Sequence, residues 1–192
     1  MILELYNNLI EKEGIDKSSF VGCLEDNIED MINKIKIENN ICEPEELEGL
    51  TMSSLPKSII DFLKNYISDD DIDLGADVIQ LGKQDFVKEN TQLMPGALMV
   101  GFKYLTFAST TGGNAICFNL NEITDGEPSI YIVDHSIVSG RKVGISHGME
   151  MEFFSLDNSN VHKVVKKVAS SFSELLNILI NDEISDIETF LY

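Results

Sequence analysis

The chain has 192 residues, of which 43% are hydrophobic, and its 33 acidic side chains against 14 basic ones give a formal net charge of −19. This apolar content excludes a disordered acidic tail, and the shortage of lysine and arginine argues against nucleic acid or an anionic membrane as the partner. A chain of this size buries roughly 70% of its unfolded surface, so one well-packed domain is expected, although two small ones also fit the length.

The cysteines carry information about the compartment. Cys23, Cys42 and Cys117 are far apart in the sequence and odd in number. A disulfide framework is therefore not expected, and a reducing environment is favoured. The first residues lack the basic segment of a signal peptide, and no apolar run is long enough to cross a membrane. We therefore expect a soluble, cytoplasmic protein.

The first 42 residues are predicted to form an N-terminal helical extension. Apolar residues recur at helical spacing over residues 2–10 and again over residues 20–35, where Ser18 and Ser19 are candidate caps. This part of the chain is also the most acidic, since residues 1–50 carry 4 basic and 13 acidic side chains, a net charge of −9.

A third helix is predicted over residues 57–66, because a proline at its start is preorganised for a helical turn and Ser54 can cap it. It ends in an acidic run at residues 68–73. Beyond this run the period changes, and the pattern predicts a short strand over residues 78–81 and one or two helical turns over residues 84–89.

From residue 97 onward the pattern is typical of strands. Runs rich in β-branched and aromatic residues are separated by glycine-containing turns, which predicts an antiparallel meander. These runs cover residues 97–102, 104–108, 115–120, 129–133 and 149–154, and a long amphipathic helix is predicted over residues 161–181. Helices, then strands, then a helix indicate an α+β fold with about five to six strands and helices packed on one side of the sheet.

Four stretches, taken in order, resemble motifs of the SUKH superfamily, which includes bacterial immunity proteins and fungal regulators of cell-wall synthesis. Residues 45–63 resemble the family's E-x-x-L-G and L-P-x-x-Y-x-x-F-L opening, and residues 107–118 resemble its F-A … G-G-D strand–turn–strand. Residues 130–135 resemble its V-Y-x-x-D-H strand, and residues 169–176 its A-x-S-F-x-E-F-L helix. Residues 43–192 are therefore predicted to form a SUKH-like domain.

The first 40 or so residues have no counterpart in the family, and the rest of the chain departs from the family pattern at three places. Asn114 stands where the family typically has aspartate, and the acidic run at 68–71 replaces a small Asn-Gly turn. The segment at 136–154 looks expanded. The departing acidic run is a candidate for partner-specific contacts.

The resemblance implies a non-enzymatic immunity-type protein that neutralises a cognate toxin by occluding its active surface. Such toxins are commonly basic, nucleic-acid-targeting enzymes, and a strong negative field steers a basic partner. The alternative, implied by the fungal branch, is an intracellular regulator or scaffold of cell-wall synthesis. The candidate contacts, chosen by charge and loop position, are Asp69, Asp70, Asp71, Asp73, Glu122, Asp125 and Glu127. The oligomeric state stays open.

Other motifs point to chemistry, but their contexts do not fit. Residues 144–148 match the G-x-S-x-G nucleophile turn, with Asp157 and His162 downstream in hydrolase order. The residues that follow alternate like a strand instead of forming the required helix, so a hairpin is favoured. The acidic run at 69–73 fails the glycine and glutamate positions of a calcium loop, and the histidines and cysteines lack zinc-ligand spacing. No catalytic residue, metal or cofactor is predicted.

Overall fold

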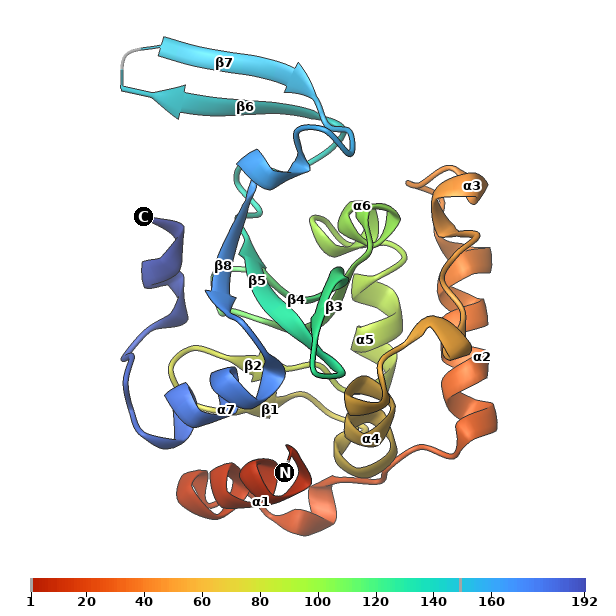
Figure 1. Cartoon of the computed structure of the whole chain (residues 1–192), viewed down its shortest axis with the longest axis vertical. Helices are drawn as coiled ribbons and strands as arrows, with labels where there is room; N and C mark the ends of the chain where they lie inside the picture. Colours follow the sequence, from red (N-terminus) through yellow and green to blue (C-terminus); the bar gives the residue numbers. More distant parts are fainter. Residues whose placement is uncertain (1, 149) are drawn as a thin grey trace.

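Figure 1 shows the computed structural model of the chain, which describes residues 2–148 and 150–192. The helices are α1 (Ile2–Glu13), α2 (Glu25–Glu38), α3 (Pro44–Leu47), α4 (Lys57–Tyr66), α5 (Lys83–Glu89), α6 (Gly96–Met99) and α7 (Phe172–Ile180). The strands are β1 (Ile72–Asp73), β2 (Ile79–Gln80), β3 (Tyr104–Ser109), β4 (Ala115–Thr124), β5 (Glu127–Val133), β6 (Lys142–His147), β7 (Glu150–Ser155) and β8 (Val165–Ala169). Short 3-10 turns are η1 (Lys17–Ser19), η2 (Met52–Ser54), η3 (Val100–Phe102), η4 (Val161–Lys163) and η5 (Ile187–Leu191).

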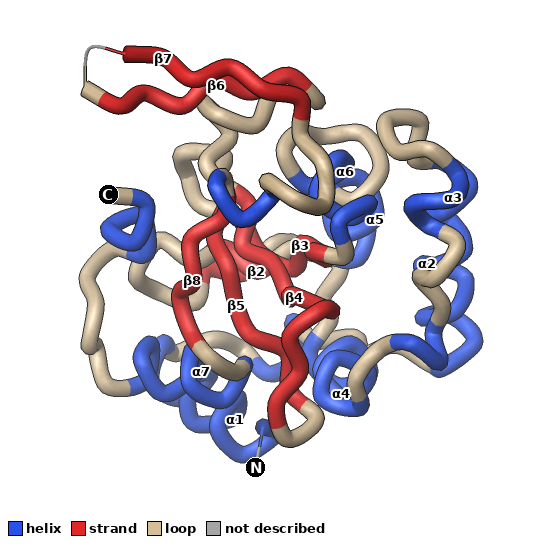
Figure 2. Tube along the Cα trace, turned by 45° about the horizontal axis from the view of Figure 1, so that its top comes forward, coloured by secondary structure: helices blue, strands red, loops and turns tan. Residues whose placement is uncertain are grey.

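A six-stranded antiparallel sheet with the order β1-β2-β3-β4-β5-β8 forms the centre of the molecule. The two-stranded ribbon β6-β7 is inserted between β5 and β8 and pairs with neither (Figure 2). Neighbouring strands of the main sheet follow one another in the chain apart from this insertion. The predicted α+β fold and meander are therefore confirmed. Within the described residues, no helix is both long enough and apolar enough to span a membrane.

The two N-terminal helices are confirmed, but the second begins later than predicted. Ser18 and Ser19 belong to η1, which Asp16 caps, and they do not cap α2. Gly22 adopts a left-handed backbone (φ 63°), and its N–H donates to the Ile67 carbonyl oxygen. This extended segment ties the chain to the end of α4, so α2 starts only at Glu25.

The start of α4 also differs in its cap. Ser54 exchanges hydrogen bonds with Thr51 inside η2, and Pro56 occupies the position before the first helical residue. The helix itself is confirmed over the predicted residues 57–66.

The strand predicted over residues 97–102 is wrong, because this segment forms α6 and η3. The N–H groups of Ala97 and Met99 donate to the carbonyl oxygens of Leu93 and Pro95, which is helical pairing. Residues 96–99 are buried on every side. A short run that is apolar all round has no periodicity to distinguish a strand from a helix, which explains the error.

The long helix predicted over residues 161–181 is also wrong. The segment divides into η4, the edge strand β8 and the shorter helix α7. Strand β8 ends at Ala169, and Ser171 caps α7 by accepting a hydrogen bond from the Glu174 N–H. Strand β8 pairs with β5, which would otherwise be an open sheet edge. Tertiary pairing therefore overrides an amphipathic pattern that continues across the break.

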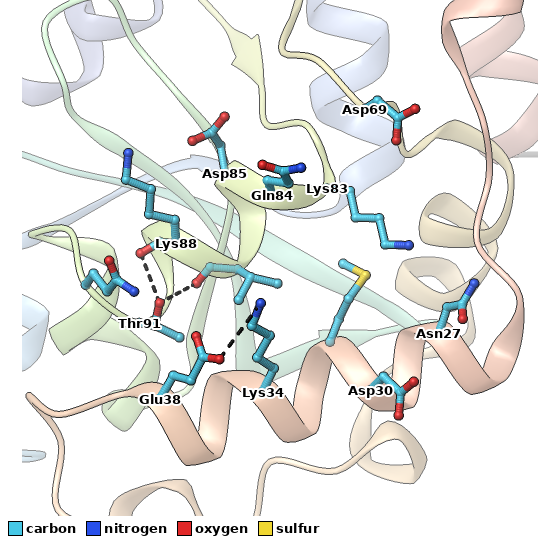
Figure 3. Close-up of a pocket in the computed structure, with 13 residues that line it drawn as sticks. Asn27, Asp30, Lys34, Glu38, Asp69, Lys83, Gln84, Asp85, Lys88 and Thr91 are labelled. Atoms are coloured by element: carbon cyan, nitrogen blue, oxygen red, sulfur yellow. Dashed lines mark hydrogen bonds and ion pairs between the residues drawn. The ribbon is translucent and has the colours of Figure 1, made fainter.

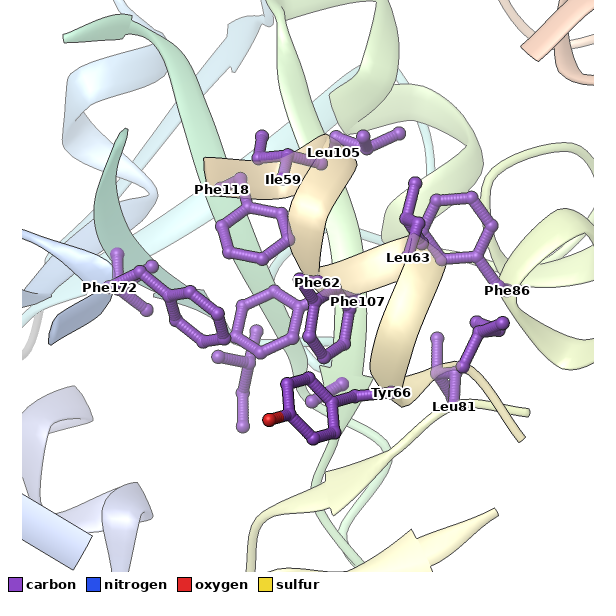
Figure 4. Close-up of a cluster of buried hydrophobic side chains, with 14 of the residues drawn as sticks. Ile59, Phe62, Leu63, Tyr66, Leu81, Phe86, Leu105, Phe107, Phe118 and Phe172 are labelled. Carbon is purple, nitrogen blue, oxygen red and sulfur yellow. The ribbon is translucent and has the colours of Figure 1, made fainter. Parts of the chain in front are cut away.

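The core under one face of the sheet is built on aromatic rings (Figure 4). Phe107 of β3 and Phe118 of β4 stack at a ring-centroid distance of 4.0 Å. Phe62 of α4 and Phe172 of α7 meet these rings edge-on, and the centroids of their own two rings are 5.4 Å apart. Edge-to-face and stacked pairs add to the stabilisation that burial provides. This cluster fixes α4 and α7 on the same face of the sheet.

The first helix belongs to the same core. Tyr6 is fully buried and stacks on Tyr66 of α4 with a centroid distance of 4.2 Å. The Tyr66 hydroxyl donates to the Leu3 carbonyl oxygen at 2.8 Å, and Leu9 is also fully buried. Helices α1, α4 and α7 thus cover one face. The opposite face is covered at one end by α6 and by apolar residues of the β5–β8 connection.

We predict that Tyr6→Phe preserves or raises the free energy of unfolding. The Tyr6 hydroxyl is buried without a hydrogen-bond partner among the described residues, so removing it relieves a desolvation cost of about 1 kcal/mol. The matched control Tyr66→Phe loses the bond to Leu3 and is expected to lose about 1 kcal/mol. Denaturant unfolding of both variants checks this, and a greater loss in Tyr6→Phe than in Tyr66→Phe would contradict it.

Candidate functional site

A groove with a cavity of about 720 Å³ lies between α2 and α5 (Figure 3). Helix α2 contributes Asn27, Asp30, Met31, Lys34 and Glu38, and α5 with the residues after it contributes Lys83, Gln84, Asp85, Val87, Lys88, Thr91 and Gln92. Asp69, from the acidic run that the sequence singled out, completes the lining. The groove therefore joins an N-terminal helix to the predicted contact loop.

The α2 wall follows from helical spacing. Asp30, Lys34 and Glu38 stand four residues apart, so they share one face of the helix. Lys34 Nζ lies 3.8 Å from a carboxylate oxygen of Glu38. Met31 and Val87 are almost fully buried and form an apolar floor between the two helices.

The opposite wall depends on a close backbone approach at Gly82. A Cβ at this position would lie 2.6 Å from the Asp69 carbonyl oxygen, so only glycine fits without a shift. The Gly82 N–H donates to Asp71 Oδ1 at 2.7 Å, and the Lys83 N–H donates to the Ser68 carbonyl oxygen at 2.8 Å. These contacts hold the acidic loop against the start of α5 and place Asp69 at the groove.

The charges in the groove are mixed. Four carboxylates and three lysines line it, a net charge of −1. Asp30 and Asp69 lie on opposite sides, and the Lys83 side chain extends across the groove toward α2 (Figure 3). Among the described residues, neither of these two carboxylates nor the Lys83 ammonium forms an ion pair. The groove thus offers both charge signs beside an apolar floor, which suits a protein surface better than a single small ion.

The acidic loop contains both structural and unengaged carboxylates. Asp71 accepts from Gly82, and Asp73 Oδ1 accepts from the Gly75 N–H at 2.9 Å. The exposed side chains of Asp69 and Asp70 accept no hydrogen bond from the described residues. Asp69 and Asp70 are therefore the members of this loop that are free to meet a partner.

The second predicted group belongs to the β4–β5 hairpin. Glu122 accepts from Lys167 Nζ at 2.5 Å and from the Tyr131 hydroxyl at 2.8 Å, and these bonds lower the pKa of its carboxyl group. Glu127 accepts from both the backbone and the hydroxyl of Ser173 at the start of α7. Asp125 is exposed at the turn with φ 53°. No described hydrogen bond or ion pair joins this group to the acidic loop.

The serine-hydrolase motif lies in the ribbon. Ser146 belongs to β6, and its hydroxyl donates to the Gly148 carbonyl oxygen at 3.2 Å. Asp157 accepts from the backbone and hydroxyl of Ser159. Among the described residues, no hydrogen bond links Ser146, Asp157 and His162, so the constellation lacks the contacts of a triad.

An acidic cluster near the C-terminus was not foreseen from the sequence. Carboxylate oxygens of Asp77, Asp186 and Glu188 lie within 4.8 Å of one another and could hold a cation. Each already accepts a hydrogen bond: Asp77 from Thr111, Asp186 from the Glu188 N–H, and Glu188 from Asn114. Asp77 is far from Asp186 and Glu188 in the sequence, so no local sequence motif indicates this cluster.

Asn114 connects three segments. Its Nδ2 donates to Glu188 Oε1 at 2.6 Å, and its Oδ1 accepts from the backbone N–H of His135 at 3.1 Å. The side chain is almost fully buried. An aspartate here would present a second carboxylate to Glu188 in place of a donor.

Glu89 lies on α5 with its side chain inside the protein, only 8% exposed. Burial, followed by the nearby Asp85 carboxylate, raises the pKa of Glu89 from 4.5 to about 7, while the Gly96 N–H acts in the opposite direction. Helix α5 therefore contains, away from the groove lining, a carboxyl group that keeps its proton into the neutral range.

Comparison with known proteins does not assign this site. A scan against protein-family models matches no family, and searches of curated proteins and of solved structures find no similar protein.

We expect the free energy of unfolding to fall as the pH rises from 4.5 to about 7, because the folded state keeps the Glu89 proton that the unfolded chain releases. Glu89→Gln removes this pH dependence. Above pH 7 the free energy of unfolding of Glu89→Gln is expected to exceed that of the wild type by at most about 3 kcal/mol. The control Asp85→Asn removes only the second cause of the raised pKa of Glu89, so its free energy of unfolding is expected to rise by less. Unfolding curves at several pH values test this, and equal pH slopes in wild type and Glu89→Gln would refute it.

Asn114→Asp is expected to lower the free energy of unfolding by about 1–3 kcal/mol at neutral pH, since two carboxylates then meet where a hydrogen bond was. Adding Glu188→Gln restores a donor, so the double variant recovers most of the loss. Denaturant titrations of the two single variants and the double variant supply the measurement. Additive losses would show that these residues do not interact.

Proposed function

We propose that the protein is a non-enzymatic binding protein that recognises a basic protein partner through the α2–α5 groove. Following its resemblance to the SUKH superfamily, we propose that it acts as an immunity-type protein that neutralises a cognate toxin by occlusion. The observation that carries the proposal is the meeting of two acidic segments, α2 and the Asp69–Asp73 loop, at one groove.

Electrostatics supports a basic partner. The chain carries 19 more acidic than basic side chains, and α2 presents exposed carboxylates at Asp26, Glu29 and Asp30, of which Asp30 lines the groove. Such a surface raises the association rate of a basic protein and repels acidic competitors. Lys83 and Lys34 then supply contacts for carboxylates on the partner and so contribute specificity.

Internal contacts are compatible with the resemblance. The two stretches that resemble the family's G-G-D and D-H motifs meet through the bond between Asn114 and His135. The departure from aspartate at 114 has a local cause in this chain, because Glu188 occupies the neighbouring position. A difference at this residue therefore does not argue against the proposal.

Co-expression with the product of the adjacent gene tests the function. We expect the two proteins to copurify and the toxicity of the partner to be relieved. Asp30→Asn/Asp69→Asn is expected to weaken the complex about tenfold at low salt, and this difference shrinks as salt is added. Titration calorimetry at two salt concentrations measures both effects.

Matched variants separate the groove from the overall charge. Glu4→Gln/Glu183→Gln removes the same two charges from exposed positions elsewhere, and Asp125→Asn tests the hairpin. Equal weakening by the groove pair and this control would reject the groove as the contact surface. An absent complex together with unrelieved toxicity would reject the immunity function for that gene pair.

A further inference from the structure

The ribbon β6-β7 stands away from the main sheet. Figures 1 and 2 both show it projecting from the body, with β7 outermost and β6 between β7 and the rest. At its base, the Arg141 guanidinium forms a two-pronged ion pair with Glu46 of α3. An isolated two-stranded ribbon is only marginally stable, and its unpaired outer edge can accept another strand.

One face of the ribbon carries two exposed apolar side chains. The register pairs Gly144 with Phe153 and Ser146 with Met151, so the Phe153 and Met151 side chains share a face. Phe153 is 77% exposed and Met151 is 52% exposed. A Cβ at Gly144 would lie 2.9 Å from the Phe153 ring, so the glycine lets the ring lie across the neighbouring strand. The patch is therefore a built feature of the ribbon.

The charge of the ribbon differs from that of the whole chain. Residues 141–155 contain two basic and two acidic side chains, a sum of zero, whereas the chain carries −19. Lys163 Nζ also lies 2.6 Å from Glu152 Oε1 and neutralises it locally. A strongly basic partner gains little here, while a second copy of this acidic chain meets no net repulsion at this place.

We propose that the ribbon is a self-association element, in which β7 pairs antiparallel with β7 of a second copy. A two-fold axis at Glu152 places Met151 of each copy opposite Phe153 of the other, where sulfur and ring make a favourable contact. The product is a four-stranded sheet, β6-β7-β7-β6, which passes the usual minimum for a stable sheet.

The same arrangement brings two like charges to the axis, where each has a lysine of its own copy beside it. The two Glu152 carboxylates come together, but each is paired with its own Lys163. The ribbons project from their bodies, so the acidic bodies remain separated and screened by salt. The contact area is small, which makes the dimer weak and dependent on concentration.

Sedimentation velocity from micromolar to millimolar concentration tests the proposal on the full chain. The wild type is expected to rise from its monomer mass of 21.4 kDa toward twice that value. Met151→Thr/Phe153→Thr is expected to stay monomeric, while Ile37→Gln, which removes a side chain that is 83% exposed on α2, behaves as the wild type. A wild type that stays monomeric, or a double variant that dimerises equally well, overturns the proposal.

Cysteine crosslinking tests the register independently. The native cysteines are all buried, so they give little background. The cysteine of Glu152→Cys lies opposite the same cysteine of the second copy and is expected to form a disulfide-linked dimer on oxidation. The cysteine of Met151→Cys lies opposite Phe153 of the second copy and is expected to form no such dimer. Crosslinking of Met151→Cys in preference to Glu152→Cys overturns the register. Unchanged thermal unfolding of the variants confirms that the body remains folded.

Discussion

The burial of Phe62 against Phe107, Phe118 and Phe172 is the contact on which the rest of the molecule depends. It joins the sheet to α4 and α7, two helices that are more than 100 residues apart in the chain. Tyr6 extends the same cluster to α1 through its stack on Tyr66. Because aromatic rings bury large areas in fixed relative orientations, this cluster sets the angles at which the helices meet the sheet.

The position of α4 decides where the groove forms. Its last turn receives the α1–α2 connection through the backbone bonds from Val21 and Gly22 to Ile67. The next residue, Ser68, accepts from the Lys83 N–H at the start of α5. Both walls of the groove are thereby attached to one helix end. A binding surface supported in this way needs little reorganisation when a partner arrives, which limits the entropy cost of association.

The excess of acidic residues divides into two functional kinds. Some carboxylates, such as Glu127 at α7 and Asp71 at α5, accept hydrogen bonds that hold elements together. Others, such as Asp69 and Asp30, stand at the groove without a described partner. A net charge treats all of them alike, but only the second kind can offer its full charge to another protein. The neutral ribbon is a third, separate surface, with apolar side chains in place of charge.

Several elements could be predicted from the sequence, and the errors have identifiable causes. Helices α1 and α4 follow from residue spacing, because each has one buried face that imposes a helical period. Strands β3, β4 and β5 follow from runs of β-branched and aromatic residues between glycine-containing turns. The segment that forms α6 is buried on all sides, so its hydrophobic pattern has no period that distinguishes a helix from a strand. The strand β8 was hidden inside a continuous amphipathic pattern, since only pairing with β5 decides its conformation.

The candidate site shows the same division. The sequence by itself determined the charge, the acidic loop at 69–73 and the α+β order of elements, since these depend on composition and local spacing. Only the tertiary structure decided that Asp69 faces α2 across a groove and that Glu127 caps a helix. The physical reason is that a carboxylate's role depends on which donors the fold brings within hydrogen-bond distance, and those donors come from remote parts of the chain.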